Sequence, residues 1–248
     1  MHTHFTCGAV NKESTLYEYP VFADKSNHYE CPYCKHDVIL RQGEIRVHHF
    51  AHKSENNSCS YYTKPTSKHI ISDAKFIVES CFKQNIPIHI TQNCSYTRNF
   101  YSTCKKTLNT TIQSDENTSI ALNHQFTYND YENVADIAII NNTTNQMIYT
   151  MECFSEKTYN DVVESSVLFS KLFNRSGPCF KISADEIISN YNPELTELNV
   201  HCTQNYLLCD PCKRLYKIEE EKNKVDEDTH KLMRQRLQQL RERRKKNN

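Results

Sequence analysis

The chain has 248 residues, with 30 basic and 30 acidic side chains, 38% apolar residues and a mean hydropathy of -0.74. This composition suits a buried core under a polar surface, and no apolar run approaches the roughly 20 residues that span a bilayer. The first residues lack the hydrophobic segment of a signal peptide, so we expect an intracellular protein, cytoplasmic or nuclear and not secreted, with no membrane partner. The chain has only 3 Gly and no Gly-rich phosphate loop, which argues against a nucleotide cofactor.

The order of the predicted elements indicates an α/β fold, mixed α+β in type, with three parts. Residues 1–62 form a small module rich in Cys and His, residues 63–212 combine helices and strands and hold a second Cys cluster, and residues 213–248 form a charged helical tail. Apolar residues recur at seven-residue steps from Ile218 to Leu232, which is typical of a helix that pairs with another. We therefore expect self-association through this helix, or a solvated helix.

Within the middle part, the apolar pattern predicts two helices and several strands. Residues 67–84 carry apolar side chains at helical spacing, and a second helix begins at residue 184 with acids in its first turn. Strand patterns occur at 86–91, 109–113, 133–140, 147–154 and 179–183. The strands that end at Ile140 and start at Met147 are joined by the turn-like NNTTNQ, and we predict a hairpin there.

A first cluster of metal-ligating side chains lies in the N-terminal module. Zinc favours thiolate and imidazole ligands in a tetrahedron, and a C-x2-C pair supplies two thiolates from one tight turn. Cys31 and Cys34 form such a pair, and His49, His52 and Cys59 follow. In a reducing compartment this pattern indicates metal rather than disulfides. We predict a structural zinc ion held by the cysteine pair and two of the other three residues.

A second cluster joins the C-x2-C pair Cys209 and Cys212 to cysteines far away in the sequence. The pair needs one or two further ligands to complete a tetrahedron, and Cys94 and Cys104 lie in the loop between two predicted strands. Cys202 is an alternative member. We predict a second zinc site and leave its ligand set open. The remaining cysteines are expected to be free thiols, namely Cys7, Cys81, Cys153 and Cys179.

The segment that runs from CPYC at residue 31 through VILRQGEIRVHHFAHK resembles the N-terminal region of competence protein CoiA-like proteins. The shared pattern is a CPxC, a VxxRxG and an HFxH. The resemblance implies that a zinc-finger-like module precedes a restriction-endonuclease-like domain of the PD-(D/E)xK type. In that family the domain begins with a helix bearing Ser-x-x-His and a Lys, and SKHIISDAK supplies Ser67, His69 and Lys75 at a different spacing. For His69 two roles stay open, orienting a phosphate or packing against the sheet.

The resemblance continues more weakly to Ile188 and covers about three quarters of the chain. The segment from ECFSEKT to FKISADEII resembles members from large viruses, which also carry a late Cys cluster. The chain is rich in Asn, Tyr, Lys and Ile and poor in Gly, which is compatible with an AT-rich coding sequence such as that of a large DNA virus. We therefore expect a viral protein.

Independently of the family, Asp136 and Glu152 lie on the two strands of the predicted hairpin. Two carboxylates at a strand edge can hold a Mg2+ ion that polarises a phosphodiester and activates water. Apolar residues flank Asp136, where an unpaired carboxylate would be costly. We predict a catalytic Mg2+ site, with ordinary exposed acids as the alternative. Glu132 is a further candidate ligand or a surface acid.

The third position of this motif departs from the family's pattern. The family places Lys or Gln two residues after the Glu to orient the nucleophile, but this chain has Phe154. A phenylalanine cannot take that role. Lys157, or Lys75 from the first helix, could substitute, or the site is inactive.

These observations predict a DNA-processing protein, specifically a Mg2+-dependent nuclease with DNA as its partner. The alternative is an inactive, zinc-stabilised scaffold that binds nucleic acid or protein. Residues 231–248 contain eight basic residues and one acid. Such a tail offers phosphate contacts whose strength falls with salt, although a nuclear localisation signal or a solvated chain end would show the same pattern.

Overall fold

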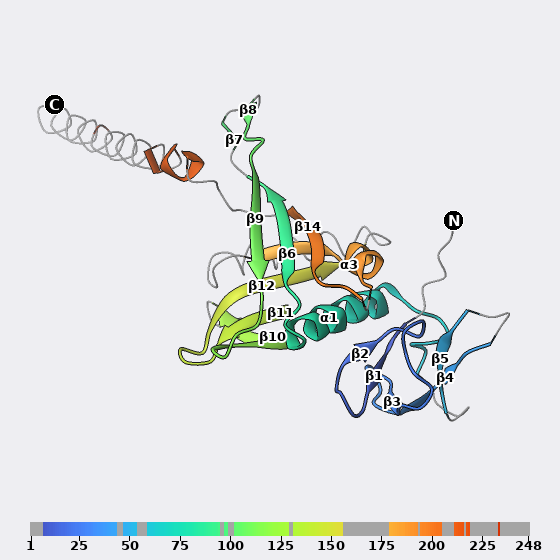
Figure 1. The fold of residues 1–248 in the computed structure, drawn as a ribbon. Helices are drawn as coiled ribbons and strands as arrows, with labels where there is room; N and C mark the ends of the chain where they lie inside the picture. The colour runs from blue at the N-terminus through green and yellow to red at the C-terminus, as the bar shows by residue number, and fades with distance from the viewer. Residues whose placement is uncertain are drawn as a thin grey trace, which may run out of the picture. The chain divides into compact units, whose positions relative to one another are not determined.

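The fold is described from a computed structural model (Figure 1). The structure describes residues 7–43, 47–53, 59–94, 97–98, 102–128, 131–155, 179–192, 194–204, 211–215, 217–218 and 233. The residues predicted as sites at Lys157 and Cys209, and nearly all of the predicted tail helix, lie outside these ranges. The chain divides into two compact units, Met1–Asn93 with Thr107–Tyr206, and Cys94–Lys106 with Leu207–Asn248.

The N-terminal module is an antiparallel five-stranded sheet in the order β2-β1-β3-β4-β5. Its core relies on aromatic rings, because the buried Tyr29 and Phe50 lie 4.9 Å apart between ring centroids. A sheet this small buries little apolar surface, and such modules often gain stability from a bound metal. Its strands are β1 (Ala9–Asn11), β2 (Tyr17–Glu18), β3 (Tyr29–Glu30), β4 (Asp37–Arg41) and β5 (His49–His52).

Helix α1 (Ser67–Lys83) follows the module and confirms the helix predicted at residues 67–84. At its start, the backbone N–H of Thr66 donates to Nδ1 of His69 at 3.0 Å, which satisfies a group at the helix end. Just beyond its last turn, Asn85 adopts a φ of 58°, a left-handed conformation that Asn tolerates. The buried face of the helix is an apolar stripe at helical spacing, formed by Ile70, Ala74, Ile77 and Val78.

Seven strands form the large sheet, in the order β10-β11-β12-β13-β14-β6-β9. Strands β10, β11 and β12 form an antiparallel meander, whereas β13 pairs with β12 in parallel. Helix α1 packs against β10, β12 and β6 and crosses the sheet in Figure 1. The strands are β6 (Ile88–Asn93), β9 (Thr107–Ile112), β10 (Thr118–Tyr128), β11 (Tyr131–Asn141), β12 (Gln146–Phe154), β13 (Cys179–Ser183) and β14 (Leu198–Gln204).

The structure confirms the mixed α+β class and most of the predicted elements. The hairpin is β11 and β12, and the strand predicted at 179–183 is β13 with the same bounds. A short helix, α3 (Ala184–Asn190), follows β13. Its N-cap is Ser183, whose Oγ accepts a hydrogen bond from the backbone N–H of Glu186. Strands β10 and β14 were not predicted, because polar residues interrupt their apolar alternation. No helix among the described residues is long and apolar enough to cross a membrane.

A buried carboxyl group joins the N-terminal module to α1. Asp73, on α1, is completely buried, and its Oδ1 accepts hydrogen bonds from the hydroxyls of Tyr17 and Tyr61 in the module. The backbone N–H of Tyr17 donates in turn to Oγ of Ser80 on the same helix, at 2.8 Å. The module is therefore attached to the helix through polar contacts that a solvent-exposed linker would lack.

We expect Asp73→Asn to gain stability relative to the wild type as the pH rises. Burial raises the pKa of Asp73 well above its usual range. An acid with a raised pKa contributes stability that is complete below the unfolded pKa of about 3.9 and is lost as the pH rises through the folded pKa. The difference in unfolding free energy should grow by at most about 1.4 kcal/mol per pH unit. Denaturant unfolding of both proteins at several pH values measures it.

Ser80→Ala is the matched control for this experiment. It removes a neutral buried group from the same helix that also contacts Tyr17. Its effect on stability should therefore not change with pH. If Asp73→Asn and Ser80→Ala give equally flat differences, the carboxyl of Asp73 does not titrate as described.

Candidate functional site

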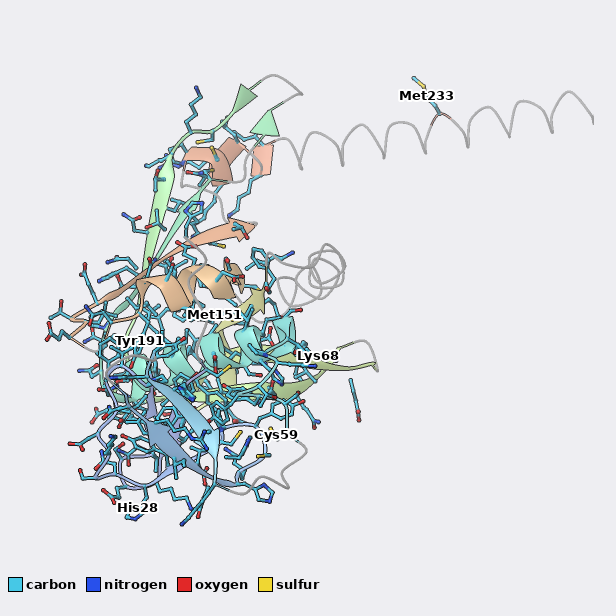
Figure 2. All side chains as sticks on the ribbon, turned by 90° about the vertical axis from the view of Figure 1, so that its right-hand side faces the viewer. His28, Cys59, Lys68, Met151, Tyr191 and Met233 are labelled. Atoms are coloured by element: carbon cyan, nitrogen blue, oxygen red, sulfur yellow. The ribbon has the colours of Figure 1, made fainter. Side chains whose placement is uncertain are left out.

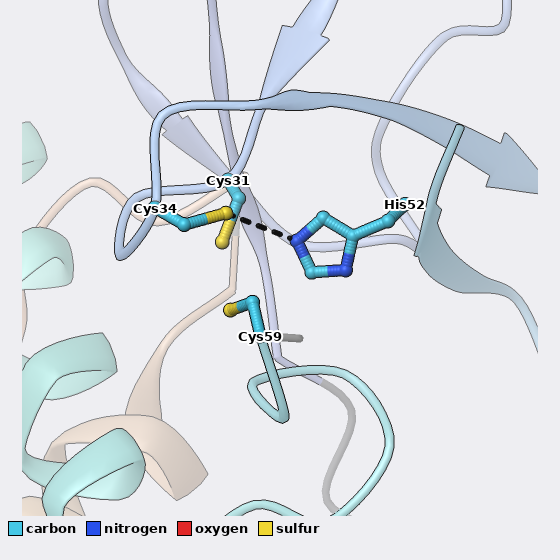
Figure 3. Close-up of side chains that lie close together, drawn as sticks. All are labelled: Cys31, Cys34, His52 and Cys59. Atoms are coloured by element: carbon cyan, nitrogen blue, oxygen red, sulfur yellow. Dashed lines mark hydrogen bonds between the residues drawn. The ribbon is translucent and has the colours of Figure 1, made fainter. Parts of the chain in front are cut away.

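The first Cys/His cluster converges in the N-terminal module. Cys31 and Cys34 flank the turn between β3 and β4, His52 ends β5, and Cys59 lies shortly before α1. One ligand atom from each of the four residues lies within 4.8 Å of all the others, and Sγ of Cys34 is 3.2 Å from Nε2 of His52 (Figure 3). Three sulfur atoms and one imidazole nitrogen are a donor set that zinc accepts. These side chains could hold a metal ion such as zinc.

His49 does not join this group, although the sequence left it open as a ligand. His49 and His52 are three residues apart on β5, and successive strand residues point to opposite faces. Nδ1 of His49 instead lies 3.0 Å from the backbone oxygen of Val47. Strand parity thus selects His52, and the loop before α1 supplies Cys59.

A bound metal ion would change the protonation of these cysteines. Burial raises the pKa of the Cys31 thiol to about 12 and also raises that of Cys59. Without a cation these thiols would keep their protons at neutral pH. A bound metal ion deprotonates coordinating thiols, so zinc binding here would release protons.

The second Cys cluster lies within the second compact unit. Cys94 and Cys104 flank the hairpin of β7 (Thr97–Arg98) and β8 (Ser102–Thr103), and Cys212 lies in the helical turn at residues 211–215. Their sulfur atoms lie within 4.8 Å of one another, and Cys94 and Cys212 are buried. The group could hold a metal ion such as zinc.

Among the described residues, the second group consists of Cys94, Cys104 and Cys212 and does not include Cys202, which the sequence offered as an alternative member. Cys202 lies buried on β14 in the large sheet, and the three grouped cysteines belong to the other unit. Its place in a strand of the sheet, rather than in the loop after it, directs it to the core. Cys209 lies outside the described residues, so a fourth thiolate from it stays a prediction.

We expect Cys104→Ser to remove about one equivalent of bound metal from the full-length protein. A serine hydroxyl is a poor zinc ligand compared with a thiolate, and only three cysteines form the described group. Cys202→Ser is the matched control and should keep the wild-type metal content. Metal analysis of the purified proteins decides the matter, and equal metal content in both variants would exclude this site.

Asp136 and Glu152 come together on the hairpin of β11 and β12. The pairing of Ile137 with Met151, continued by one residue, places Asp136 opposite Glu152. Each carboxyl group accepts from the other strand: Oδ2 of Asp136 from the backbone N–H of Cys153 at 3.0 Å, and Oε1 of Glu152 from that of Asp136 at 3.3 Å. The two carboxyl groups are close enough for the charge of Asp136 to raise the pKa of Glu152.

The neighbouring strands extend this pair into a row of four polar residues across the sheet. Asn123 on β10 lies opposite Asp136 in the antiparallel register, and its φ of 51° interrupts the regular strand there. Lys181 on β13 pairs with Glu152 in the parallel register. Paired residues on adjacent strands point to the same face. Asn123, Asp136, Glu152 and Lys181 therefore form one row, which we call the polar row.

Lys75 reaches the polar row from α1. Its Nζ donates to Oδ1 of Asp136 at 2.8 Å and to Oδ1 of Asn123 at 2.7 Å. The Lys75 side chain is 10% exposed and that of Asp136 is 23% exposed. The ion pair is therefore shielded from water and held in place by α1, while Asp136 keeps some access to solvent.

Burial shapes the electrostatics at the other end of the row. Glu152 and Lys181 are both buried. Burial, and then the neighbouring charge of Asp136, raise the pKa of Glu152 well above its usual range. Burial lowers the pKa of Lys181, although the nearby Glu152 opposes that shift. Proton-binding groups whose pKa values move toward neutrality are common at catalytic sites.

A cavity of about 480 Å³ opens onto Asp136. It lies between the N-terminal module, α1, β10 and β11, and Lys68 of α1, labelled in Figure 2, is one of its lining residues. The volume falls in the range of sites that bind small molecules or single nucleotides, roughly 300–1,000 Å³. The cavity is lined by residues that include Pro32, Tyr33, Lys68, Lys75, Asn123 and Asp136.

The sequence also predicts His69 and Lys157 as candidate site residues. His69 is buried at the start of α1, accepts the Thr66 N–H and contacts the rings of Tyr33 and Tyr61 edge-on. His69 thus packs against rings of the N-terminal module, and it does not line the cavity at Asp136. Lys157 lies outside the described residues.

Sequence reasoning missed Asn123 and Lys181. Lys181 lies in the predicted strand at 179–183, where a lysine flanked by Phe180 and Ile182 was a signal for a buried, functional charge. Asn123 carried no such signal, because its strand was not predicted. Only the register of the sheet places both residues beside the carboxyl pair.

Residues 18–62 match the family model described as Competence protein CoiA, N-terminal domain. The matched range contains all four residues of the first Cys/His group. The match confirms the predicted resemblance to CoiA-like proteins over this module. No curated protein and no solved structure matches the chain.

Proposed function

We propose that this chain is a metal-dependent nuclease that hydrolyses phosphodiester bonds in DNA. The observation that carries the proposal is the polar row, in which two adjacent carboxyl groups lie between an amide and a lysine, with Lys75 bonded to Asp136. Hydrolysis of a phosphodiester needs cation ligands and positive groups that stabilise developing negative charge. The match to the CoiA N-terminal domain supports DNA processing as the context.

Asp136 and Glu152 fit a hard divalent cation such as Mg2+. Carboxylate oxygens are the ligands that Mg2+ prefers, and it needs only one or two from the protein. Burying two adjacent carboxyl groups without a cation is unfavourable, because burial and the charge of Asp136 both raise the pKa of Glu152. When bound, the ion would polarise a phosphate oxygen and lower the pKa of a bound water.

The two lysines hold complementary positions around the carboxyl pair. Lys75 donates to Asp136 at the cavity wall, so its ammonium group lies where a phosphate entering the cavity would carry negative charge. Lys181 lies on the other side, next to Glu152. In this arrangement Lys75 fixes the orientation of Asp136 and neutralises substrate charge, while Lys181 acts on the attacking water.

Lys181 also accounts for the phenylalanine at the third position of the motif. Residues two apart on a strand share a face, so Phe154 points to the same side as Glu152. Nζ of Lys181 lies 5.2 Å from the centroid of the Phe154 ring. The ammonium group that the family places on this strand is therefore supplied by the next strand, and the ring provides the surface on which it rests.

A lysine-relocation experiment tests this assignment. We expect Lys181→Met to reduce Mg2+-dependent DNA cleavage on the order of 100-fold, the effect of removing one stabilising donor. Adding Phe154→Lys to that variant should restore part of the lost activity, because it returns an ammonium group to the strand of Glu152. Cleavage of single-stranded and duplex DNA by the wild type and both variants is measured under identical conditions, with thermal unfolding as the check on folding.

Three results would count against the proposal or its details. A wild type that cleaves neither substrate with Mg2+ or Mn2+ would favour the alternative, a zinc-stabilised binding scaffold. Full activity in folded Lys181→Met would remove Lys181 from the site. A double variant as inactive as the single one would show that position 154 cannot replace Lys181.

A further inference from the structure

The turn that carries the first two cysteines also forms a wall of the cavity at Asp136. Pro32 and Tyr33 are the two residues between Cys31 and Cys34, and both line the cavity. The turn is closed by a hydrogen bond from the backbone N–H of Lys35 to the backbone oxygen of Cys31 at 2.9 Å. The cysteine cluster thus determines where the ring of Tyr33 lies relative to the candidate catalytic groups.

Tyr33 packs against two neighbouring rings and is nevertheless mostly exposed to solvent. It stacks on Tyr61 with an interplanar angle of 20° and a centroid distance of 6.2 Å, and it meets the ring of His69 edge-on at 5.2 Å. Tyr61 and His69 are buried, whereas Tyr33 is 59% exposed. Large aromatic rings exposed to this degree on a rigid turn are typical of binding surfaces.

Positive charge lies next to this ring. Lys68 lines the cavity together with Lys75. Lys35 follows the cysteine turn, and its Nζ lies 5.8 Å from the centroid of Phe76, a second aromatic ring of the cavity wall. Aromatic rings interleaved with lysines are the arrangement by which proteins hold single-stranded nucleic acid, with bases on the rings and phosphates on the cations.

We propose that Tyr33 stacks against an unpaired base of the DNA strand whose phosphate enters the cavity at Asp136. In a duplex both faces of a base are covered by its neighbours, so only an unpaired or terminal base offers a free face to the ring. The site is therefore built for single-stranded DNA, or for a strand end. The inference rests on the proposed function for the identity of the ligand, and it names the strand form that the site takes.

Binding of a single-stranded oligonucleotide that contains 2-aminopurine tests the proposal in the full-length protein. Ca2+ replaces Mg2+ so that the DNA is bound without being cut. We expect Tyr33→Ala to weaken binding about tenfold, the effect of losing one base–aromatic contact, and to abolish the quenching of 2-aminopurine fluorescence. Tyr33→Phe keeps the ring and should bind within about twofold of the wild type. The affinity for a blunt duplex of the same sequence should change less than twofold in either variant.

Two further variants separate stacking from folding. Phe22→Ala removes another exposed aromatic ring of the same module that does not line the cavity, and it should leave binding unchanged. Tyr33→Leu keeps an apolar side chain on the cysteine turn but removes the ring. It tests stacking in the event that Tyr33→Ala loses bound metal. Unchanged single-strand affinity in the folded Leu variant, equal losses for both DNA forms, or failure of the Phe variant to bind would each overturn the proposal.

The same proteins distinguish this inference from the proposed function. The first case is a wild type that cleaves DNA and a Tyr33→Leu variant that binds single strands equally well. This result would contradict the stacking role of Tyr33 and support the nuclease proposal. The second case is a wild type that binds the oligonucleotide and quenches its 2-aminopurine fluorescence but never cleaves it. This result would contradict the nuclease proposal and support the stacking role. A wild type that does not bind the oligonucleotide overturns both.

Discussion

Asp136→Asn is expected to lower the rate of Mg2+-dependent DNA cleavage by about 1,000-fold. A cation at this site supplies several kcal/mol of transition-state stabilisation, and about 4 kcal/mol corresponds to a factor of that size. The amide has one acceptor oxygen, so it can keep the hydrogen bond from Lys75 or that from the backbone N–H of Cys153, but not both. It also lacks the negative charge that holds the cation. The substitution should therefore remove the chemistry, and thermal unfolding measures what the lost hydrogen bond costs in stability.

The control for this variant is Glu132→Gln. Glu132 is an exposed acid on the same strand, four residues away, and was itself a candidate ligand on sequence grounds. Its amide variant should cleave DNA at the wild-type rate. Single-turnover cleavage with saturating enzyme gives the rate of the chemical step for all three proteins, and a cooperative thermal unfolding transition shows that they are folded. Similar rates in Asp136→Asn and the wild type would rule out the polar row as the active site.

His52→Ala should unfold or strongly loosen the N-terminal module, whereas His49→Ala should leave it intact. Structural zinc in small modules contributes on the order of 10 kcal/mol of binding free energy that folding depends on. The module has a small core, so losing one of four ligands should lower its stability by several kcal/mol. The two histidines lie at opposite ends of β5, and only His52 meets the cysteines.

Metal analysis and limited proteolysis of the two histidine variants measure this difference. His52→Ala should lose about one equivalent of metal and become susceptible to cleavage within residues 1–62, because an unfolded module no longer protects its chain. His49→Ala should match the wild type in both measurements. The reverse result, with metal lost only from His49→Ala, would mean that the ligand set around Cys31 is different.

The contacts between the N-terminal module and α1 give these experiments a shared consequence. Tyr17 and Tyr61 bind Asp73 on α1, and Lys75 lies two residues further along the same helix. Loss of metal from the module should therefore disturb α1 and the cavity as well. Reduced DNA binding in His52→Ala would follow from this connection, because Tyr33 belongs to the same cysteine turn.

The sequence by itself determined the local features of this protein. The C-x2-C spacing identified Cys31 and Cys34, helical periodicity identified α1, and apolar alternation identified β11, β12 and β13 with Asp136 and Glu152 on the hairpin. These features depend on residues close together in the chain, whose spacing decides which side chains share a face. The helix and strands that the structure confirms could therefore be predicted from local spacing.

Tertiary structure decided which of these side chains meet. The sequence allowed His49 or His52 as a ligand, and strand parity places only His52 beside the cysteines. Lys181 lies 29 residues after Glu152 and became its neighbour only because β13 pairs with β12 in parallel. The pairing of distant strands depends on the packing of the whole sheet and not on local spacing. The metal-ligand types could therefore be predicted from the sequence, whereas the lysine beside Glu152 and the cavity wall at Tyr33 could not.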